Sequence, residues 1–555
     1  MSKYSNSAWN RFFNLLKLER KDILQIFYYA LFAGILSLSL PLGVQAIINL
    51  IQGAQISSSW IILVVLVTLG VSFTGTLQIM QMRIIETLQQ RIFTRASFEL
   101  SYRFPKLKMN ALRNQYPPEL ANRFFDTLSI QKGLAKILID VPTALIQIVF
   151  TLILLSFYHP FFILFGLGLL ILMFFVFQYT VRRGLDTSIE ESKHKYRVAH
   201  WIQEIARSIV SFKLAGHTDL ALRKNDELVS GYLQAREAHF RIIKLQYIKL
   251  IAFKVAVTAG LLVIGGALVL NQQMNIGQFV AAEIIILLVI ASVEKLIVSL
   301  ETLYDMLTSI EKLGQLVDLE TEAQDGIIWD DDQPFTLELK DIEYSVPDVD
   351  RPILSGINLQ IAPKEIVLVR GTSGSGKSIL LRLLAGVIQP TKGTVFVGEY
   401  NLKALELRKY RSLLGLSLSD EAPFEGTLKE NLNFGDPSIS EAAIRKVLDK
   451  LGLQEFVKTQ PYGLETFINP EGKHMSYSVT KKLILARALL HRPQCLILED
   501  PLDIFTSGET QSVIDYLCAP EHPWSVIVVS NNHYWEKKST QIVQLEEGRL
   551  TTLKK

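Results

Sequence analysis

The chain has 555 residues, of which 49% are hydrophobic, and its 57 Lys and Arg residues nearly balance 54 Asp and Glu residues, for a net charge of +3. This length predicts more than one domain, and this apolar content is too high for an ordinary soluble protein. The absence of a basic block argues against a nucleic-acid partner. Cys495 and Cys518 lack the spacing of metal ligands, and we expect both to be structural.

The first 22 residues are mixed and charged, and they do not have the pattern of a cleavable signal peptide. Trp9, Phe12, Phe13 and Leu16 have the spacing of one helix face. Residues 1–22 are therefore expected to contain an interfacial helix that lies on a membrane surface.

Six apolar stretches follow, each long enough to supply the roughly 20 residues that a membrane-spanning helix needs. They predict an all-α, six-span transmembrane domain over residues 23–317. The predicted spans are Ile23–Ile51, Trp60–Ile85, Ile137–Tyr158, Phe161–Val181, Tyr247–Leu270 and Ile276–Leu300.

Basic residues alternate sharply between the connections of these spans. Gln52–Ser59 and Asn271–Asn275 contain no Lys or Arg, whereas the N-terminus, Arg83–Lys136 and Arg182–Lys244 are rich in them. By the positive-inside rule, both termini and both long loops are cytoplasmic, in a multi-pass protein of the cell (inner) membrane.

The two long loops have charged, helix-patterned arms that continue the spans. Arms of this length should carry the turns Asn110–Glu119 and Glu204–Gly216 about 30 Å or more into the cytoplasm. There they could touch a soluble domain.

Ionisable residues inside spans usually face a cavity or the interior of a bundle. Lys254 and Glu283 are our candidates for the wall of a transport cavity, with a place outside any transport path as the open alternative. Four others lie near span ends, where they can reach the interface: Asp140, Lys249, Glu294 and Lys295.

An acidic stretch, Asp318–Asp332, predicts a linker over residues 318–334. From Phe335 to residue 555, strand and helix patterns alternate as in a soluble α/β domain.

The strongest motif of this domain fits G-x-x-x-x-G-K-[ST], a phosphate-cradling P-loop. The apolar run Ile366–Val369 predicts a strand before it, and a helix pattern follows it, as phosphate binding requires. Lys377 is expected to reach the β/γ-phosphates and Ser378 to bind Mg²⁺, with an ordinary Gly/Ser turn as the alternative. The predicted cofactor-binding residues of the loop are Gly371, Thr372, Ser373, Gly374, Ser375, Gly376, Lys377 and Ser378.

A six-span block followed by a P-loop domain resembles an ABC exporter half-transporter over nearly the whole chain. Asn122–Leu138 and Glu204–Ala215 resemble the coupling-loop regions of that family. The layout is most similar to bacterial type I secretion and peptide exporters. The resemblance implies a dimer with two ATP·Mg²⁺ sites, each between the Walker motifs of one domain and the signature loop of the other. Implied partners are the lipid bilayer, a second half-transporter, identical or different, and a periplasmic adaptor of a secretion system.

Compared with that family, several motifs are altered. Val346 stands where an aromatic residue stacks on adenine, and a valine cannot stack in this way; Tyr344 is the alternative. Ser419 replaces the glutamine that links Mg²⁺, water and the membrane domain. The signature loop keeps Ser476, but Tyr477 replaces a glycine that lets the backbone approach phosphate, so a weak grip is expected.

The two Walker B acids are inverted. Glu499 could still bind Mg²⁺, whereas Asp500 takes the place of the general base and is one methylene short. A misplacement of about 1 Å can cost roughly 100-fold in rate, although a tolerated exchange of one acid for another is the alternative. Asn531 replaces the switch histidine and cannot carry its charge, and His533 is expected on the surface. Asp503-Ile504-Phe505-Thr506 replaces the pattern that couples the two sites.

The catalytic positions Asp500, Asn531 and Ser419 are therefore degenerate. The sequence predicts an exporter subunit that binds ATP and moves a peptide, protein or lipophilic substrate out across the membrane, with weak or partner-dependent hydrolysis. The alternative is a catalytically silent nucleotide-binding component with a structural or regulatory role in a transport or secretion assembly. A vigorous homodimeric ATPase is disfavoured, because Asp500 and Asn531 both miss their roles.

Overall fold

The computed structural model describes residues 3–52, 58–113, 115–158, 160–330, 333–346, 351–502 and 505–554. The chain divides into two compact units. One is helical and comprises Met1–Pro105 and Asn114–Leu319; the other is α/β and comprises Lys106–Arg113 and Glu320–Lys555. The fold is thus a helical membrane domain joined to an α/β domain, as the sequence predicts.

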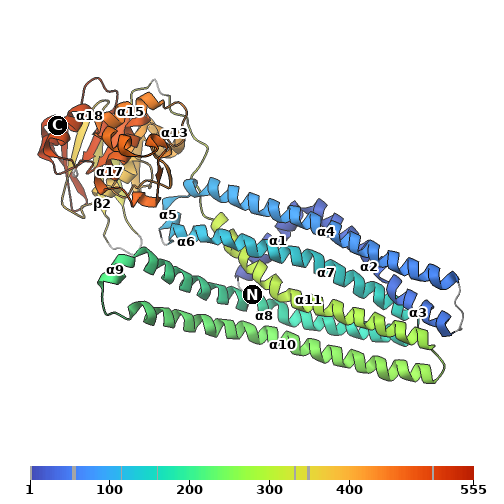
Figure 1. Ribbon diagram of the computed structural model, residues 1–555. Helices are drawn as coiled ribbons and strands as arrows, with labels where there is room; N and C mark the ends of the chain where they lie inside the picture. The colour runs from blue at the N-terminus through green and yellow to red at the C-terminus, as the bar shows by residue number, and fades with distance from the viewer. Residues whose placement is uncertain are drawn as a thin grey trace. The chain divides into compact units, whose positions relative to one another are not determined.

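Long helices, joined by the short helices α6 and α9, build the helical unit (Figure 1). Their bounds are α1 Lys3–Leu18, α2 Arg20–Ser37, α3 Ser39–Gln52, α4 Ser58–Arg103, α6 Pro117–Asn122, α7 Asp126–Ser156, α8 Phe161–Arg207, α9 Ile209–Leu214, α10 Leu220–Leu270 and α11 Ile276–Val317.

Five helical segments of the described chain are long and apolar enough to cross a membrane. They confirm five of the six predicted spans as apolar helices of sufficient length. The sixth, Phe161–Val181, begins α8, where many side chains lie outside the described residues. The predicted membrane orientation of the termini stays a prediction.

The first span is broken between α2 and α3 at Leu38. Pro41 lies three residues later, where it has no backbone N–H to donate and its ring clashes with the carbonyl of Ser37. The Ser37 hydroxyl turns back to donate to the carbonyl of Gly34 (2.7 Å). One apolar stretch in the sequence therefore becomes two helices.

The proposed cavity residues have different environments. The Lys254 ammonium donates to the Glu294 carboxylate at 2.7 Å, from α10 to α11, so this cation has a partner that the sequence did not indicate. Glu283 lies on an exposed side of α11. Whether either residue lines a transport path stays a prediction.

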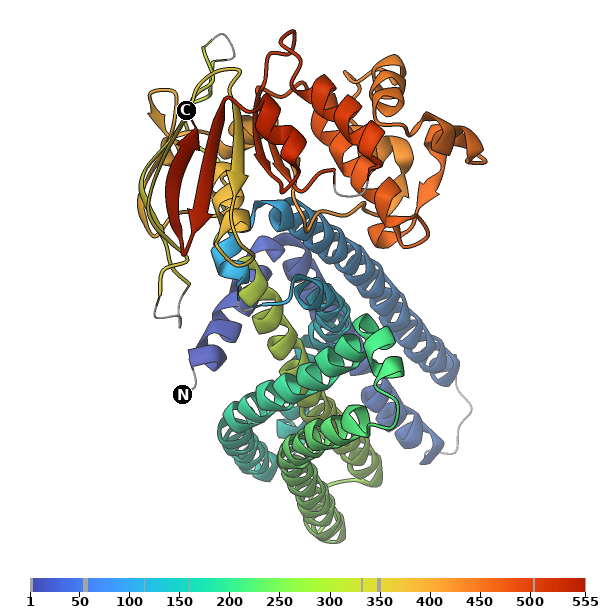
Figure 2. The same cartoon turned by 90° about the vertical axis from the view of Figure 1, so that its left-hand side faces the viewer.

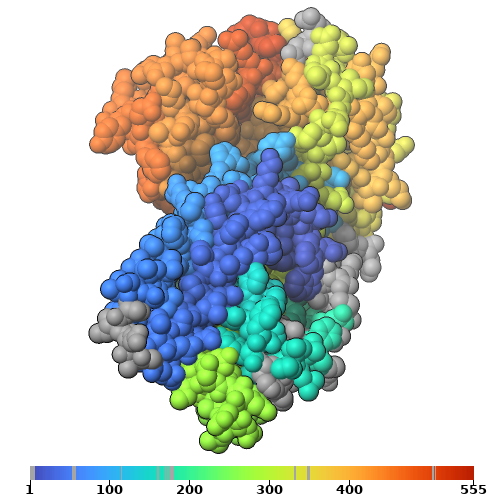
Figure 3. Space-filling view, turned by 90° about the vertical axis from the view of Figure 1, so that its right-hand side faces the viewer, coloured from blue at the N-terminus to red at the C-terminus, as the bar shows by residue number. Residues whose placement is uncertain are grey.

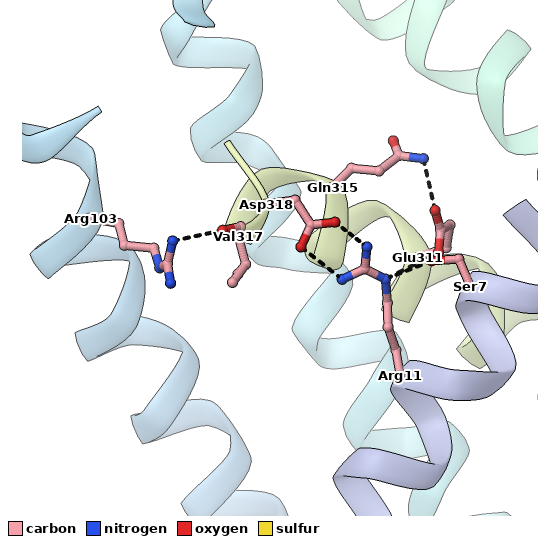
Figure 4. Close-up of polar contacts among 7 residues, drawn as sticks. All are labelled: Ser7, Arg11, Arg103, Glu311, Gln315, Val317 and Asp318. Atoms are coloured by element: carbon pink, nitrogen blue, oxygen red, sulfur yellow. Dashed lines mark hydrogen bonds and ion pairs between the residues drawn. The ribbon is translucent and has the colours of Figure 1, made fainter. Parts of the chain in front are cut away.

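Helix α1 is tied to the end of α11 through Arg11 (Figure 4). The Arg11 guanidinium donates to the Asp318 carboxylate (3.3 Å) and to buried Glu311 (3.3 Å). Arg103 at the end of α4 donates to the carbonyl of Val317 (2.7 Å). Both cations lie where the free carbonyls of a helix C-terminus are negative, so they stabilise the last turn of α11. The N-terminal helices form much of one face of this unit (Figure 3).

The α/β unit has a four-stranded antiparallel sheet and a six-stranded sheet of order β12-β11-β3-β10-β9-β6 (Figure 2). In the six-stranded sheet, Val367 and Val369 face one apolar cluster and Leu368 faces the other, so both faces are buried. The strands are β1 Leu337–Tyr344, β2 Leu354–Ile361, β3 Ile366–Arg370, β4 Lys392–Val397, β5 Tyr400–Asn401, β6 Leu414–Ser417, β7 Gly426–Thr427, β8 Phe467–Ile468, β9 Cys495–Glu499, β10 Ser525–Val529, β11 Gln541–Glu546 and β12 Arg549–Lys554.

Helices complete this unit on the flanks of the sheets. They are α5 Met109–Leu112, α12 Lys377–Leu384, α13 Leu407–Ser412, α14 Leu428–Asn433, α15 Glu441–Lys450, α16 Gln454–Thr459, α17 Tyr477–Leu490, α18 Ser507–Leu517 and α19 His533–Lys538.

The predicted linker is ordered along most of its described length. Leu107, which follows α4, pairs with Thr321 as an antiparallel bridge. Glu322 then makes two 2.7 Å hydrogen bonds with Arg411 of α13, the fork geometry that is strongest for this pair. Trp329 is only 2% exposed and packs in the core of the α/β unit. Residues 320–329 thus belong to the α/β unit rather than to a free tether.

Replacing Trp329 by Ala should lower the free energy of local unfolding of the α/β unit by about 3–5 kcal/mol, because the change leaves a large cavity in a packed core. Amides of β1 and β4 should then exchange faster in hydrogen exchange on the full-length protein. Ile328→Ala is the matched control at the neighbouring position. The Ile328 side chain is 68% exposed, so its loss should lower the free energy of unfolding by about 0.5 kcal/mol or less. Equal exchange in the two variants would contradict this account.

Candidate functional site

The predicted site residues come from the same edge of the six-stranded sheet. Strands β3, β10, β9 and β6 are neighbours and run parallel. Their carboxyl ends therefore meet at one edge, where ligands bind in parallel α/β sheets. The P-loop follows β3, Asn531 follows β10, Glu499 ends β9 with Asp500 next, and Ser419 follows β6.

The P-loop has a backbone that glycine makes possible. Gly374 (φ 80°) and Gly376 (φ 102°) are left-handed, and a Cβ on Gly371 would lie 2.2 Å from the carbonyl oxygen of Leu545. The Lys377 ammonium donates back to the carbonyls of Gly371 (2.9 Å) and Thr372 (2.8 Å).

Two features of the loop fit a phosphate ligand. The Ser375 side chain is 5% exposed, and its hydroxyl has no partner within the described part of the chain. Among the described residues, the Lys377 ammonium is held only by neutral carbonyls, which an anion would displace. Because α12 begins directly after the loop, its amide groups add positive charge at the same place.

The two predicted metal ligands are in direct contact. The Ser378 hydroxyl donates to one oxygen of Glu499, and the Ser419 backbone amide donates to the other oxygen at 3.0 Å. Burial acts to raise the pKa of Glu499, but these hydrogen bonds outweigh it and the pKa is lowered. An ionised carboxylate beside a hydroxyl is a donor set that suits Mg²⁺.

Asp500 and Asn531 lie on adjacent strand ends. Asp500 has φ 41°, a left-handed conformation that Asp tolerates better than most residues, and its amide donates to the carbonyl of Val529 (2.9 Å). Both side chains are exposed. The structure therefore brings Asp500, Asn531, Glu499 and Ser419 to the edge that carries the P-loop.

Comparison with known families decides what this arrangement belongs to. The family described as "ABC transporter transmembrane region" matches residues 23–293, and the family described as "ABC transporter" matches residues 354–503. The chain belongs to the ABC transporter family. It is a half-transporter, with a transmembrane domain fused to an ABC nucleotide-binding domain.

Individual relatives are similar over part of their length. An "ATP-dependent lipid A-core flippase" of Burkholderia orbicola (strain AU 1054) is 27% identical over 50% of this chain and 47% of its own. A "Multidrug efflux ATP-binding/permease protein" of Mycobacterium bovis (strain BCG / Pasteur 1173P2) is 31% identical over 36% of this chain and 17% of its own. The chain thus spans about half of the length of these relatives or less.

A solved structure has the same fold. It is described as "Structure of a bacterial Atm1-family ABC exporter with ATP bound", with a TM-score of 0.82, 18% identity, and coverage of 96% of this chain and 94% of that one. At this identity the similarity concerns the fold.

Neither of the two described residues considered for stacking on adenine offers a free aromatic ring. Val346 packs against the apolar core. Tyr344 is 5% exposed, and its hydroxyl accepts a hydrogen bond from Arg113 at 2.7 Å. A ring held in this way is a poor platform for adenine, which argues against the Tyr344 alternative.

The signature loop of this ABC transporter begins α17. Ser476 is the N-cap residue of that helix and accepts from the Val479 amide (3.4 Å), while Tyr477 is 67% exposed. These two residues lie on α17 rather than on the P-loop edge. Asp503 and Ile504 of the coupling motif lie outside the described residues, and His533 is exposed as predicted.

Two cations near the site were missed by sequence reasoning. The Lys481 ammonium donates to the carbonyl of Ser419 (2.8 Å), and Arg382 pairs with Asp420 (2.9 Å). Lys481 follows Tyr477 by one helical turn, but sequence spacing gives no sign that α17 reaches the loop after β6. Lys481 thus links the signature helix to the Ser419 loop.

Replacing Glu499 by Gln should weaken Mg²⁺-dependent ATP binding by about tenfold or more, because the metal site loses its charge. The lowered pKa keeps the Glu499 carboxylate ionised as pH falls. Its contribution to Mg²⁺ binding is therefore lost only below the pH range in which a carboxyl group ordinarily titrates. The ratio of wild-type to variant affinity should therefore stay constant between about pH 8 and pH 5. Titration calorimetry checks both points, with Asp420→Asn, a loss of charge in the neighbouring loop after β6, as the control.

Proposed function

We propose that this chain is an ABC exporter subunit that binds ATP with Mg²⁺ and moves a peptide, protein or lipophilic substrate out across the membrane. The observation that carries the proposal is the phosphate cradle, in which the Lys377 ammonium donates to the carbonyls of Gly371 and Thr372 and Ser378 contacts Glu499. Lys377 and the loop amides would bind the phosphates, and Ser378 and Glu499 would hold Mg²⁺, which supplies charge neutralisation at the phosphates when bound.

Hydrolysis by this subunit is weak or depends on a partner. Asp500 stands where a carboxylate would orient the attacking water, but its side chain is one methylene shorter than glutamate. Asn531 can donate a hydrogen bond to a phosphate without adding positive charge. Each composite site of a dimer would inherit a defect from this chain, either at its Walker side or at Tyr477.

The partner is a second half-transporter, because six spans make half of the usual membrane domain. ABC exporters commonly function as dimers in the membrane. A different partner with intact motifs would favour the heterodimer, and a periplasmic adaptor would favour a role in secretion.

The second candidate is a catalytically silent component that binds nucleotide as a structural or regulatory clamp. The exposed Tyr477 ring favours this candidate, since a bulky side chain at the first turn of α17 hinders close approach to the phosphate of a nucleotide bound by the partner subunit. The two candidates differ in whether nucleotide turnover is needed for export.

Restoring the family residues at positions 500 and 531 should increase the rate of ATP hydrolysis. The double variant Asp500→Glu, Asn531→His should hydrolyse ATP in lipid at least about tenfold faster than wild type, toward the roughly 100-fold that such misplacement costs. Lys377→Ala in the same background is the control and should remove the gain. Binding without any Lys377-dependent turnover in wild type or double variant would favour the silent component.

Export measured in cells is a second test that distinguishes the two candidate functions. Lys377→Ala should stop export if ATP drives the transporter, because the loop loses its main cation for the phosphates. Lys446→Ala, which removes an exposed lysine of α15 rather than one of the P-loop, should leave export unchanged. Unchanged export in Lys377→Ala would overturn the ATP-driven proposal.

A further inference from the structure

Residues 418–421 form the loop after β6, and both acidic side chains of this loop are paired with cations. The Asp420 carboxylate accepts a hydrogen bond from Arg382 of α12 at 2.9 Å, and the Glu421 carboxylate lies 3.9 Å from the guanidinium of Arg487 of α17. The loop is therefore attached both to the helix that follows the P-loop and to the helix that carries the signature residues.

The peptide group between Leu418 and Ser419 is held at both of its ends. Its N–H, on Ser419, donates to the Glu499 carboxylate at 3.0 Å. Its carbonyl oxygen, on Leu418, lies 3.5 Å from the ammonium of Lys481, which also donates to the Ser419 carbonyl at 2.8 Å. Because the N–H and C=O of a planar trans peptide group point in opposite directions, a cation at the carbonyl end orients the N–H at the other end. The cation also strengthens this N–H as a donor, since linked hydrogen bonds polarise one another.

The Lys481 ammonium is turned toward loop carbonyls, unlike that of the next residue. The Lys482 ammonium pairs with the Glu509 carboxylate of α18 at 3.3 Å. The ring of Tyr477, one helical turn before Lys481, has its centroid 5.8 Å from the Lys481 ammonium, which is within the range of a cation–π contact. The lysine side chain is thus held on the side of α17 that meets the 418–421 loop.

These contacts continue to the predicted metal ligands. The Glu499 carboxylate accepts from the Ser419 N–H with one oxygen and from the Ser378 hydroxyl with the other. Without the Ser419 donor, one carboxylate oxygen would lose its fixed partner, and groups that orient a metal ligand typically change metal affinity by about 10–100-fold. Only the backbone of Ser419 takes part, so the short side chain at this position does not weaken the contact.

We propose that Lys481 is a positioning residue for Mg²⁺. It orients the peptide group between Leu418 and Ser419, and the Ser419 N–H then keeps the Glu499 carboxylate in place to bind the metal. Helix α17 thus serves the metal site of its own chain as well as carrying the signature residues. This inference rests on the proposed binding of ATP with Mg²⁺ and adds a residue to it. A purely electrostatic role would have the opposite sign, because an ammonium near the site repels a divalent cation.

The test is the affinity of the full-length protein in lipid nanodiscs for ATP, measured by titration calorimetry with Mg²⁺ and with EDTA. Lys481→Met, which keeps the length of the side chain but removes its charge and its donors, should weaken binding with Mg²⁺ by about tenfold. Binding in EDTA should not change, because the P-loop is intact. Lys481→Arg, which keeps the charge and the donors, should bind as wild type does.

Two further variants separate positioning from a general loss of charge or of structure. Lys473→Met removes an exposed lysine just before α17, paired only with Glu471 on the surface at 3.2 Å among the described residues, and should leave both affinities unchanged. In a Glu499→Gln background, Lys481→Met should weaken binding by less than about twofold more, because the two residues act on one contact. Lys481→Ala replaces Lys481→Met if that variant does not fold.

Two measurements do not depend on affinity or on turnover. In nucleotide-free protein, the Ser419 amide should exchange with solvent faster in Lys481→Met than in wild type and at the wild-type rate in Lys481→Arg. Mn²⁺, which takes oxygen ligands as Mg²⁺ does, should give a different paramagnetic resonance spectrum with ATP in Lys481→Met and the wild-type spectrum in Lys481→Arg.

Binding with Mg²⁺ that is unchanged or tighter in Lys481→Met would overturn the inference, and tighter binding would mean that the ammonium acts by repulsion. An equal loss with Mg²⁺ and with EDTA would also overturn it, since the effect would not concern the metal. Wild-type protein that binds no ATP in either condition would instead overturn the proposed function, and with it the role of Lys481 in metal binding.

Discussion

One carboxylate organises the nucleotide site of this transporter. Glu499 ends β9 and accepts hydrogen bonds from the Ser378 hydroxyl, after the P-loop, and from the Ser419 amide, after β6. The contact joins the first helix after the P-loop to two neighbouring strand ends, and it holds a negative charge where a cation can bind. The inverted order of the acids matters here, because glutamate at this position reaches both partners with its longer side chain. The same inversion leaves the shorter Asp500 at the position where a longer side chain is needed to reach the attacking water.

Most of the site could be predicted from the sequence because it depends on short-range order. A P-loop requires a strand, glycines and a helix within a few residues, and Ile366–Val369 with Gly374 and Gly376 supplies them. Parallel strands then bring Glu499, Ser419 and Asn531 to one edge whatever their separation in the chain. Five of the six predicted spans were predictable for a similar reason, since length and hydropathy alone decide whether a helix can cross a bilayer.

What the sequence could not reveal depends on contacts between distant elements. The Lys254–Glu294 pair joins two helices, and neither residue has a pattern that indicates the other. Arg113 donates a hydrogen bond to the Tyr344 hydroxyl. The turn Asn110–Glu119 was expected to reach a place where it could touch a soluble domain, but its sequence does not indicate this partner. The acidic composition of residues 318–332 suggested a tether, although Glu322 is paired with Arg411 and Trp329 is packed in a core. Charge in a sequence does not distinguish a solvated residue from one that has a partner.

The bridge between Leu107 and Thr321 makes the α/β unit discontinuous in the chain, since it takes one piece from before α6 and another from after α11. A gene fragment that begins at Phe335 would lack the whole first piece and the start of the second, including the Trp329 side chain. Recombination that exchanges ABC domains between transporters at the apparent boundary would therefore leave a mismatched edge. Only an exchange that carries the 106–113 segment with the C-terminal half transfers the unit whole, which restricts how this chain can evolve by shuffling.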